Sequence, residues 1–280
     1  MSDANLAPCR SWLFTPATRP DRFAKAAAVG ADVSILDLED SVAPGDKNRS
    51  RNTALDFLKA RKSDGVQYAL RVNGLDTHAG LRDLNAMLET GATPDYLVLP
   101  KTDSAGHLQI LDRLLASASK STKLVGIVES ARGLAGVEAI ASATPRLAGL
   151  MLGAADMAAD LGAATTWEPL AWARARLVAA CALAGVMAID APYFDVHDTN
   201  GLQQEMARAV AFGFGAKAAI HPGQVAAINA ALTPTQEAVE RARAILAENA
   251  KGVGTVGGQM IDEAVARKAR RTLAAAGIPV

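Results

Sequence analysis

Several features that mark large classes of protein are absent from this sequence. Its 29 basic and 29 acidic side chains cancel, so the chain has no net charge with which to attract nucleic acid or an anionic membrane. No apolar run approaches the roughly 20 residues that span a bilayer. The N-terminal residues lack a basic start followed by an apolar core, which argues against a secretory signal. We therefore expect a cytoplasmic protein that binds neither nucleic acid nor membrane.

Cysteine is scarce, and no histidine pattern of a zinc site occurs. Cys9 and Cys181 have no Cys or His neighbours, so we interpret both as free thiols in a reducing compartment, while a disulfide between them remains open. Neither HxH nor HxxxH appears, which argues against zinc. His221 stands just before Pro222, where we expect it to shape a turn.

The sequence does contain a regular alternation of short apolar runs with helical segments, punctuated by Gly or Pro. Eight runs are predicted strands: residues 12–15, 34–37, 67–71, 96–99, 123–128, 147–152, 186–189 and 216–220. The helices predicted to follow them span residues 21–29, 47–59, 80–89, 104–118, 131–141, 168–184, 199–212 and 224–232. Eight such units fit a (β/α)8 barrel, the TIM-barrel fold of the α/β class. A doubly wound sheet is disfavoured because the first turn, TPATRP, carries no GxGxxG.

The end of the chain lies beyond these eight units. We divide the chain into a barrel with a flanking helix, residues 1–250, and a C-terminal extension, residues 251–280. Residues 251–259 are a predicted glycine-rich linker, and residues 262–276 a predicted helix. The extension is not needed to close a barrel. It either packs against the barrel or another subunit, or it is a helical lid that moves on its glycine-rich hinge.

Charged side chains end four of the apolar runs. Glu39 and Asp40 follow the second run, Arg71 ends the third and Glu129 follows the fifth, while Asp156 ends the sixth if that run is extended to LAGLMLGAAD, residues 147–156. The carboxyl ends of parallel strands meet at one edge of a barrel, where the catalytic residues of this fold are found. Acids together with a cation at that edge indicate a divalent metal ion and an anionic substrate. This pattern predicts an enzyme.

Glu129 and Asp156 are the candidate metal ligands. They follow consecutive predicted strands, so they would be neighbours at the edge. Two carboxylates that leave positions for water and substrate are the usual protein ligands of Mg²⁺. The alternative is that each carboxylate caps the next helix, where the helix dipole contributes roughly 0.3–1 kcal/mol.

Arg71 and the acids near it are candidates for substrate binding. A guanidinium binds carboxylate or enolate oxygens through a planar fork, with a structural salt bridge as the alternative. Glu39 and Asp40 could hold metal-bound water or orient Arg71, or Asp40 could cap a turn before Pro44. Two roles remain open for Asp37: it could belong to the same site, or it could pair with a buried basic side chain.

Basic side chains cluster near the same edge. Arg19, Arg22 and Lys25 lie on the first loop and helix, and Lys47 begins the second helix. They could hold the phosphates of a nucleotide-like carrier, or they could form a solvated basic face. Lys101 follows the fourth strand. It could bind phosphate, or it could be an ordinary surface residue.

The motifs occur in an order that resembles one protein family. The stretches are RSWLFTPATRPDRFAKA, ADVSILDLEDSVAPGDK, ALRVNGLDT, LVLPKTDSA, IVESARGL, LMLGAADMAADLG, AAIHPGQVAAIN and VGGQMIDEAVARKAR. They span nearly the whole chain and resemble the CitE-like proteins of the HpcH/HpaI aldolase and citrate lyase β-subunit family, whose relatives include the malyl-CoA lyases. The resemblance implies a (β/α)8 barrel that assembles as a homotrimer or hexamer, with Mg²⁺ as cofactor and an acyl thioester as substrate.

The resemblance also implies roles for residues in the barrel. Glu129 and Asp156 match the family's metal ligands, and Arg71 matches its substrate-binding arginine. Glu39 and Asp40 match the acidic pair beside the metal.

A further match lies in the extension. Asp262, in GGQMID, matches a lid aspartate that malyl-CoA-lyase-like members present to a neighbouring subunit. The implied role is proton transfer, and the alternative is a cap of the last helix. Two departures, GAADM in place of GPADL or GAEDL and Ser130 in place of Thr, leave the acyl acceptor open.

Together these features predict a Mg²⁺-dependent carbon–carbon lyase. Its substrate would be a 3-hydroxyacyl thioester such as malyl-CoA or citryl- or citramalyl-CoA, cleaved to an acyl-CoA and a small 2-oxo acid. Condensation or thioester hydrolysis could use the same site. The alternatives are a CoA-independent aldolase of 2-oxo-3-deoxy acids and a non-catalytic subunit that binds an acyl carrier protein.

Overall fold

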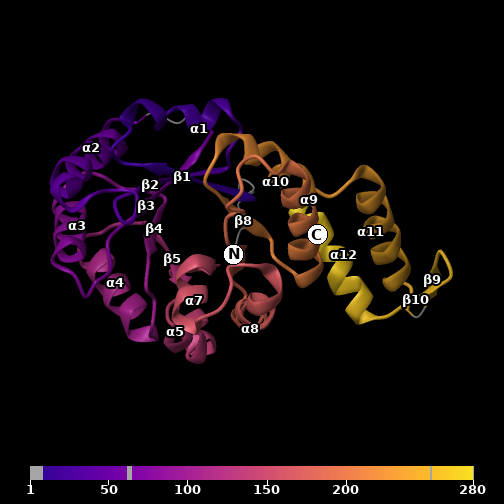
Figure 1. Cartoon of the computed structure of the whole chain (residues 1–280). Coiled ribbons are helices and arrows are strands. Elements are labelled where there is room, and N and C mark those ends of the chain that lie inside the picture. The colour runs from indigo at the N-terminus through magenta and orange to yellow at the C-terminus, as the bar shows by residue number, and fades with distance from the viewer. Residues whose placement is uncertain (1–8, 62–64, 253, 280) are drawn as a thin grey trace.

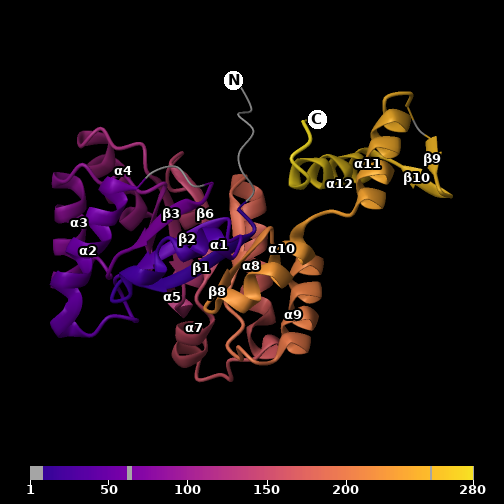
Figure 2. The same ribbon diagram turned by 90° about the horizontal axis from the view of Figure 1, so that it is seen from above.

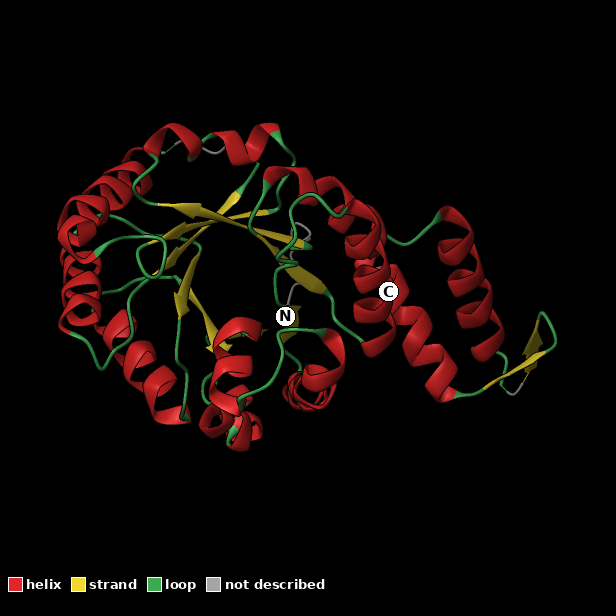
Figure 3. Cartoon of the chain, viewed as in Figure 1, coloured by secondary structure: helices red, strands yellow, loops and turns green. Residues whose placement is uncertain are grey.

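A closed barrel of parallel strands forms the body of the molecule (Figures 1 and 3). The computed structural model describes residues 9–61, 65–252 and 254–279, so the N-terminal stretch considered for a signal lies mostly outside it. The strands are β1 (Ser11–Pro16), β2 (Val33–Asp37), β3 (Gln67–Arg71), β4 (Tyr96–Leu99), β5 (Lys123–Val128), β6 (Leu147–Leu152), β7 (Met187–Asp190) and β8 (Ala216–Ala219). They pair in chain order, and β8 closes on β1, which confirms the predicted TIM barrel.

Helices surround the barrel on its outer face (Figure 1). They are α1 (Lys25–Ala28), α2 (Lys47–Ala60), α3 (His78–Glu89), α4 (Ala105–Ser117), α5 (Ala131–Ala135), α6 (Val137–Ala141), α7 (Ala154–Leu161), α8 (Trp167–Ala184), α9 (Thr199–Phe212) and α10 (Val225–Leu232). One apolar cluster fills the inside of the barrel, with Trp12, Ile35 and Ile127 among its members. A larger cluster lies between strands and helices. Since both faces of the strands are buried, the strands are apolar without alternation.

Two helical predictions needed correction. Between β6 and residue 168 the sequence predicted no helix and therefore a loop, but residues Ala154–Leu161 form the helix α7. It ends at Gly162, whose left-handed φ of 63° is the usual geometry of a glycine that terminates a helix. The helix predicted over residues 131–141 is divided at Gly136 into α5 and α6.

The C-terminal part is a separate small unit beside the barrel. It consists of α11 (Gln236–Asn249), the strands β9 (Gly254–Val256) and β10 (Gln259–Ile261), and α12 (Glu263–Ala275). The predicted linker is therefore a β-hairpin, and Gly257 and Gly258 supply the two positive φ angles of its tight turn, 57° and 76°. Val239, Ile245 and Leu273 belong to the unit's own core.

This unit projects away from the barrel (Figure 2). The linker after α10 carries it beyond α9 and α10, so it does not cover the mouth of its own barrel. No helix in the described part of the chain is long and apolar enough to cross a membrane.

Candidate active site

Arg71 and Asp37 form a buried pair at the ends of adjacent strands. The register of β2 and β3 places the two residues opposite each other. Arg71 donates from Nε to Asp37 Oδ1 at 2.7 Å and from Nη2 to Asp37 Oδ2 at 2.9 Å. Burial opposes ionisation of Asp37, but the hydrogen bonds from Arg71 outweigh it and lower its pKa. Asp37 therefore pairs with a buried base, and it also lines the cavity that leads to Arg71.

The remaining guanidinium nitrogen of Arg71 faces the other acids of the loop after β2. Nη1 lies 2.7 Å from Glu39 Oε2 and 3.5 Å from Asp40 Oδ2. Glu39 is buried, whereas the side chain of Asp40 is exposed. Burial raises the pKa of Glu39 above its ordinary value, although Arg71 and Lys101 oppose the rise. Arg71 is thus held on one side by Asp37, and only the edge near Glu39 and Asp40 is left for a substrate.

Glu129 follows β5 and is buried under the neighbouring loops. Its Oε1 accepts a hydrogen bond from the backbone N–H of Lys101 at 2.7 Å. A Cβ at Gly153 would lie 2.4 Å from the Cβ and Oε2 of Glu129, so only glycine leaves room for this carboxylate. Burial raises the pKa of Glu129 to about 7, and the negative charge of Glu39 adds to the rise. The cap of α5 is Ser130, so the capping alternative does not apply to Glu129.

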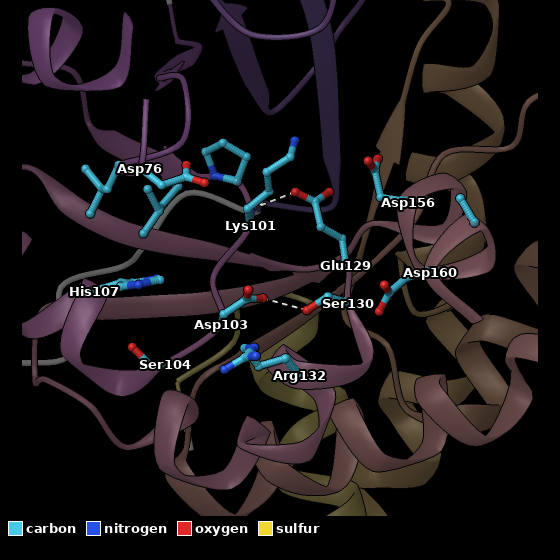
Figure 4. A pocket seen from close by; sticks show the side chains of 14 residues that line it. Asp76, Lys101, Asp103, Ser104, His107, Glu129, Ser130, Arg132, Asp156 and Asp160 are labelled. Atoms are coloured by element: carbon cyan, nitrogen blue, oxygen red, sulfur yellow. Dashed lines mark hydrogen bonds between the residues drawn. The ribbon is translucent and has the colours of Figure 1, made fainter. Parts of the chain in front are cut away.

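Asp156 lies at the same edge of the barrel, but in a different element from the predicted one. Strand β6 ends at Leu152, and Asp156 stands in the first turn of α7, so its placement at a strand end was wrong. The side chain is exposed and lies across the cavity from Glu129 (Figure 4). An acid in a first helical turn is favoured by the helix dipole, but it is not the cap of α7, which is Gly153.

Two cavities meet at Glu129 and Asp156, which line both. A polar cavity of about 820 Å³ extends over the loops after β4 and β5 and contains Lys101 and Arg132 (Figure 4). An apolar cavity of about 420 Å³ leads to Arg71. Its apolar walls are Phe14, Pro16, Ile127, Met151, Leu152, Pro192, Phe194 and Ile220.

The donors at this junction fit a hard divalent cation. Within the described residues, no group of three or more His, Cys, Asp and Glu side chains could hold a metal. The available set is two carboxylates that open on a cavity. Mg²⁺ is typically bound by one or two carboxylates with water and substrate oxygens, so the residues present fit it.

The basic residues proposed to hold phosphates have other partners in this structure. Lys47 Nζ donates to the carbonyl oxygens of Leu38 and Glu39 at 2.8 and 2.7 Å, so it stabilises the loop after β2. Arg19 is exposed and pairs with Asp21 at 2.9 Å. Neither lines the two cavities described above. Their role toward phosphate remains a prediction.

Three further sequence predictions have clear structural counterparts. The side chain of His221 accepts a hydrogen bond from Gly223, which confirms that it shapes the turn after β8. Cys9 and Cys181 form no disulfide with each other, in agreement with the expected reduced thiols. Asp262 caps α12 and accepts a hydrogen bond from Val265 at 2.9 Å. It lies in the projecting unit, outside both cavities of its own chain.

Lys101 is a site residue whose importance the sequence reasoning left open. Its Nζ donates to Glu39 Oε1 at 2.6 Å while its backbone N–H binds Glu129. A hint was present in the motif LPK, because a lysine directly after a buried strand lies at the edge where the acids gather.

Comparison with known proteins agrees with this geometry. The sequence pattern of the HpcH/HpaI aldolase/citrate lyase family matches residues 10–222. The chain belongs to this family. The expected assignment to it, and to an enzyme of the carbon–carbon lyase class, is confirmed.

Named relatives cover most of the chain. An L-malyl-CoA/beta-methylmalyl-CoA lyase of Rhodobacter capsulatus is 39% identical over an alignment of 292 positions that covers 93% of this chain and 92% of the relative. The crystal structure of RipC from Yersinia pestis is 61% identical, with a TM-score of 0.73 over 81% of this chain and 96% of RipC. CitE from Mycobacterium tuberculosis, solved with magnesium, acetoacetate and coenzyme A, is 35% identical, with a TM-score of 0.81 over 98% of this chain and all (100%) of CitE.

Proposed function

We propose that this chain is a Mg²⁺-dependent lyase that cleaves a 3-hydroxyacyl-CoA into an acyl-CoA and a small 2-oxo acid. The supporting observation is the junction of the two cavities, where Glu129 and Asp156 stand beside Arg71. The names of the relatives support the substrate class, since one is a malyl-CoA lyase and another was solved with magnesium and coenzyme A.

The reaction breaks the bond between the α-carbon of the thioester and the carbon that bears the hydroxyl group. The hydroxyl proton would pass to the carboxylate of Asp262 from another subunit, and the hydroxyl oxygen becomes the keto oxygen of the 2-oxo acid. The electron pair of the broken bond passes to the thioester as an enolate, whose α-carbon then takes up a proton. When bound, Mg²⁺ would supply Lewis-acid stabilisation of oxygens on the 2-oxo acid.

The chain's own residues would position and shield these groups. Glu129 and Asp156 would hold the metal ion. Arg71, fixed by Asp37, would place positive charge beside the reacting oxygens without reorganisation. The apolar walls near Ile127 and Met151 would exclude water and strengthen these electrostatic interactions.

The proton for the enolate would come from Asp262 of another subunit. The unit that carries Asp262 projects from the barrel and has its own core, and in this proposal it contacts a second copy. The proposed assembly is a homotrimer or hexamer. Arg19, exposed near the carboxyl end of β1, would contact the phosphates of coenzyme A.

A direct assay tests this function. The protein would be incubated with Mg²⁺ and malyl-CoA or citramalyl-CoA, and the released acyl-CoA and 2-oxo acid would be measured by mass spectrometry. We expect cleavage that disappears with EDTA and in Glu129→Gln. Cleavage of free 2-oxo-3-deoxy acids alone would support the CoA-independent aldolase, and no cleavage of any substrate would contradict an active lyase.

Mixed oligomers test the origin of the proton. Asp262→Asn and Glu129→Gln subunits, each inactive alone, should regain part of the activity when they assemble together. A general acid contributes about 10²–10⁴-fold, so even partial rescue is measurable. Absence of rescue in a verified mixed oligomer would exclude a shared site.

A further inference from the structure

Lys101 has a backbone conformation that lysine rarely adopts. Its φ is +49°, in the left-handed region, and among the described non-glycine residues only Ser119 shares this feature, with φ of +53°. Such a conformation persists in a side-chain-bearing residue only where its surroundings stabilise it. At Lys101 those surroundings are the carboxylates of the candidate active site.

The left-handed turn directs two donors of one residue at two buried acids. The backbone N–H of Lys101 meets Glu129 Oε1 at 2.7 Å, as Figure 4 shows, and its Nζ meets Glu39 Oε1 at 2.6 Å. Glu129 and Glu39 are 5% and 6% exposed, so both acceptors are buried, although the Lys101 side chain itself is partly exposed. Hydrogen bonds to ionised acceptors at these distances are among the strong ones in proteins.

The two contacts have different consequences. The backbone N–H fixes one oxygen of Glu129, while Gly153 permits the close approach of the other oxygen. The ammonium holds Oε1 of Glu39, and Oε2 of Glu39 then faces Arg71 Nη1 at 2.7 Å. Without this ammonium, the ion pair with Arg71 alone would hold the Glu39 carboxylate.

We propose that Lys101 is a positioning residue with two separable parts: its left-handed backbone orients Glu129 for metal binding, and its ammonium holds Glu39 against Arg71. The proposal rests on the proposed function, because it concerns the same metal site. It adds a residue whose backbone geometry, rather than its side chain alone, determines metal affinity. Partners that orient metal ligands commonly change metal affinity about 10–100-fold.

The backbone part is tested with a matched pair of variants. Lys101→Gly and Lys101→Val both lack the ammonium, but only glycine adopts a positive φ readily, whereas a β-branched residue strongly disfavours it. Calorimetric titration with Mg²⁺, in the absence of substrate, should show at least tenfold weaker binding to Lys101→Val than to Lys101→Gly. Equal affinities would overturn the backbone part.

Ser119 provides the control for general strain. It shares the left-handed backbone but is exposed after α4 and lines neither cavity. Ser119→Val should lower the thermal midpoint while the affinity for Mg²⁺ stays unchanged. If Ser119→Val weakens Mg²⁺ binding as much as Lys101→Val does, the effect at residue 101 is a consequence of general destabilisation, and the proposal fails.

The ammonium part is tested through activity and rescue. Lys101→Met should lower kcat at least tenfold with a smaller change in KM, and Lys101→Arg should recover part of the loss, because it restores a cation that reaches Glu39. Equal activity of Lys101→Met and the native protein would overturn this part. The two failures are distinguishable: a native protein that binds Mg²⁺ but cleaves no thioester contradicts the proposed function, whereas the comparison of glycine and valine decides the backbone part by itself.

Discussion

Two clusters of buried charge lie near the carboxyl ends of the barrel strands, and they differ in charge balance. The open cluster borders the two cavities and consists of Asp37, Glu39, Arg71, Lys101 and Glu129. The second cluster, which we call closed because its cations pair with both of its carboxylates, consists of Arg174, Asp190, Glu205 and Lys217. The open cluster contains three carboxylates and two cations, so it has one carboxylate in excess. The closed cluster contains two carboxylates and two cations.

The closed cluster shows how a barrel neutralises a charge that it must bury. Lys217 and Asp190 stand side by side on β8 and β7, and both are 0% exposed. Nζ of Lys217 donates to Asp190 at 2.6 Å, and to Glu205 and the carbonyl oxygen of Ala191 at 2.7 Å. Arg174 satisfies the other oxygen of Asp190 at 2.9 Å.

The open cluster leaves one carboxylate without a cation. That carboxylate is Glu129, whose pKa is about 7 and which faces a cavity beside Asp156. The difference teaches that burial alone does not make a functional charge. This comparison supports the proposal that Glu129, whose buried charge the chain does not balance, is available to an added cation.

The largest expected effect is the loss of folding stability when the closed cluster is disrupted. Lys217→Met would leave Asp190 and Glu205 without their shared cation, and removing one partner of a buried ion pair typically costs about 3–5 kcal/mol. Denaturant unfolding should show a loss of this size, while the fraction that remains folded binds Mg²⁺ normally. As a control, Arg49→Met removes an exposed partner of Asp46 and should cost less than about 1 kcal/mol. A fully stable Lys217→Met protein would contradict a structural role for this cluster.

The next effect concerns catalysis in the open cluster. Arg71→Lys keeps the charge but loses the fork that binds Asp37, so turnover should fall about 10²–10³-fold. Arg146→Lys is the control, because it disrupts a more exposed pair of Arg146 with Asp112 outside the site and should leave turnover unchanged. Native turnover in Arg71→Lys would show that Arg71 serves structure alone.

A smaller effect is the pH dependence of stability without metal. The pKa of Glu129 is raised on folding, so the folded state binds more protons than the unfolded state between about pH 4.5 and 7. This group's contribution therefore falls as pH rises through that window, by on the order of 1–3 kcal/mol. Glu129→Gln removes this titrating group. As the pH rises from 5 to 8 in EDTA, the variant should therefore gain stability relative to the native protein. A stability difference that does not change with pH would refute the shift.

Local pattern was sufficient to predict the barrel but not the partners within the site. Eight apolar runs separated by Gly or Pro locate the strands, because both faces of each strand are buried. The pairing of Asp37 with Arg71 depends on register, and that of Lys101 with Glu129 depends on a left-handed backbone. Neither leaves a local signal in the sequence.

Two other features were missed for related reasons. The hairpin β9–β10 has strands of three residues each, too short to show a pattern, and its glycines favoured a linker. The closed cluster was not anticipated, although its signal was present: Lys217 lies inside an apolar run, and a lysine buried in a strand must have charged partners.

Titration of Mg²⁺ into the metal-free protein tests the role of the unbalanced carboxylate most directly. Four proteins would be compared by calorimetry: the native chain, Glu129→Gln, Asp156→Asn and Asp160→Asn. Asp160 lines the same polar cavity one turn further along α7, so it controls for the loss of a nearby negative charge. We predict that Glu129→Gln and Asp156→Asn each bind Mg²⁺ at least tenfold more weakly, whereas Asp160→Asn binds it within about threefold of the native affinity. Undiminished Mg²⁺ affinity in both Glu129→Gln and Asp156→Asn would contradict the assignment of the metal site.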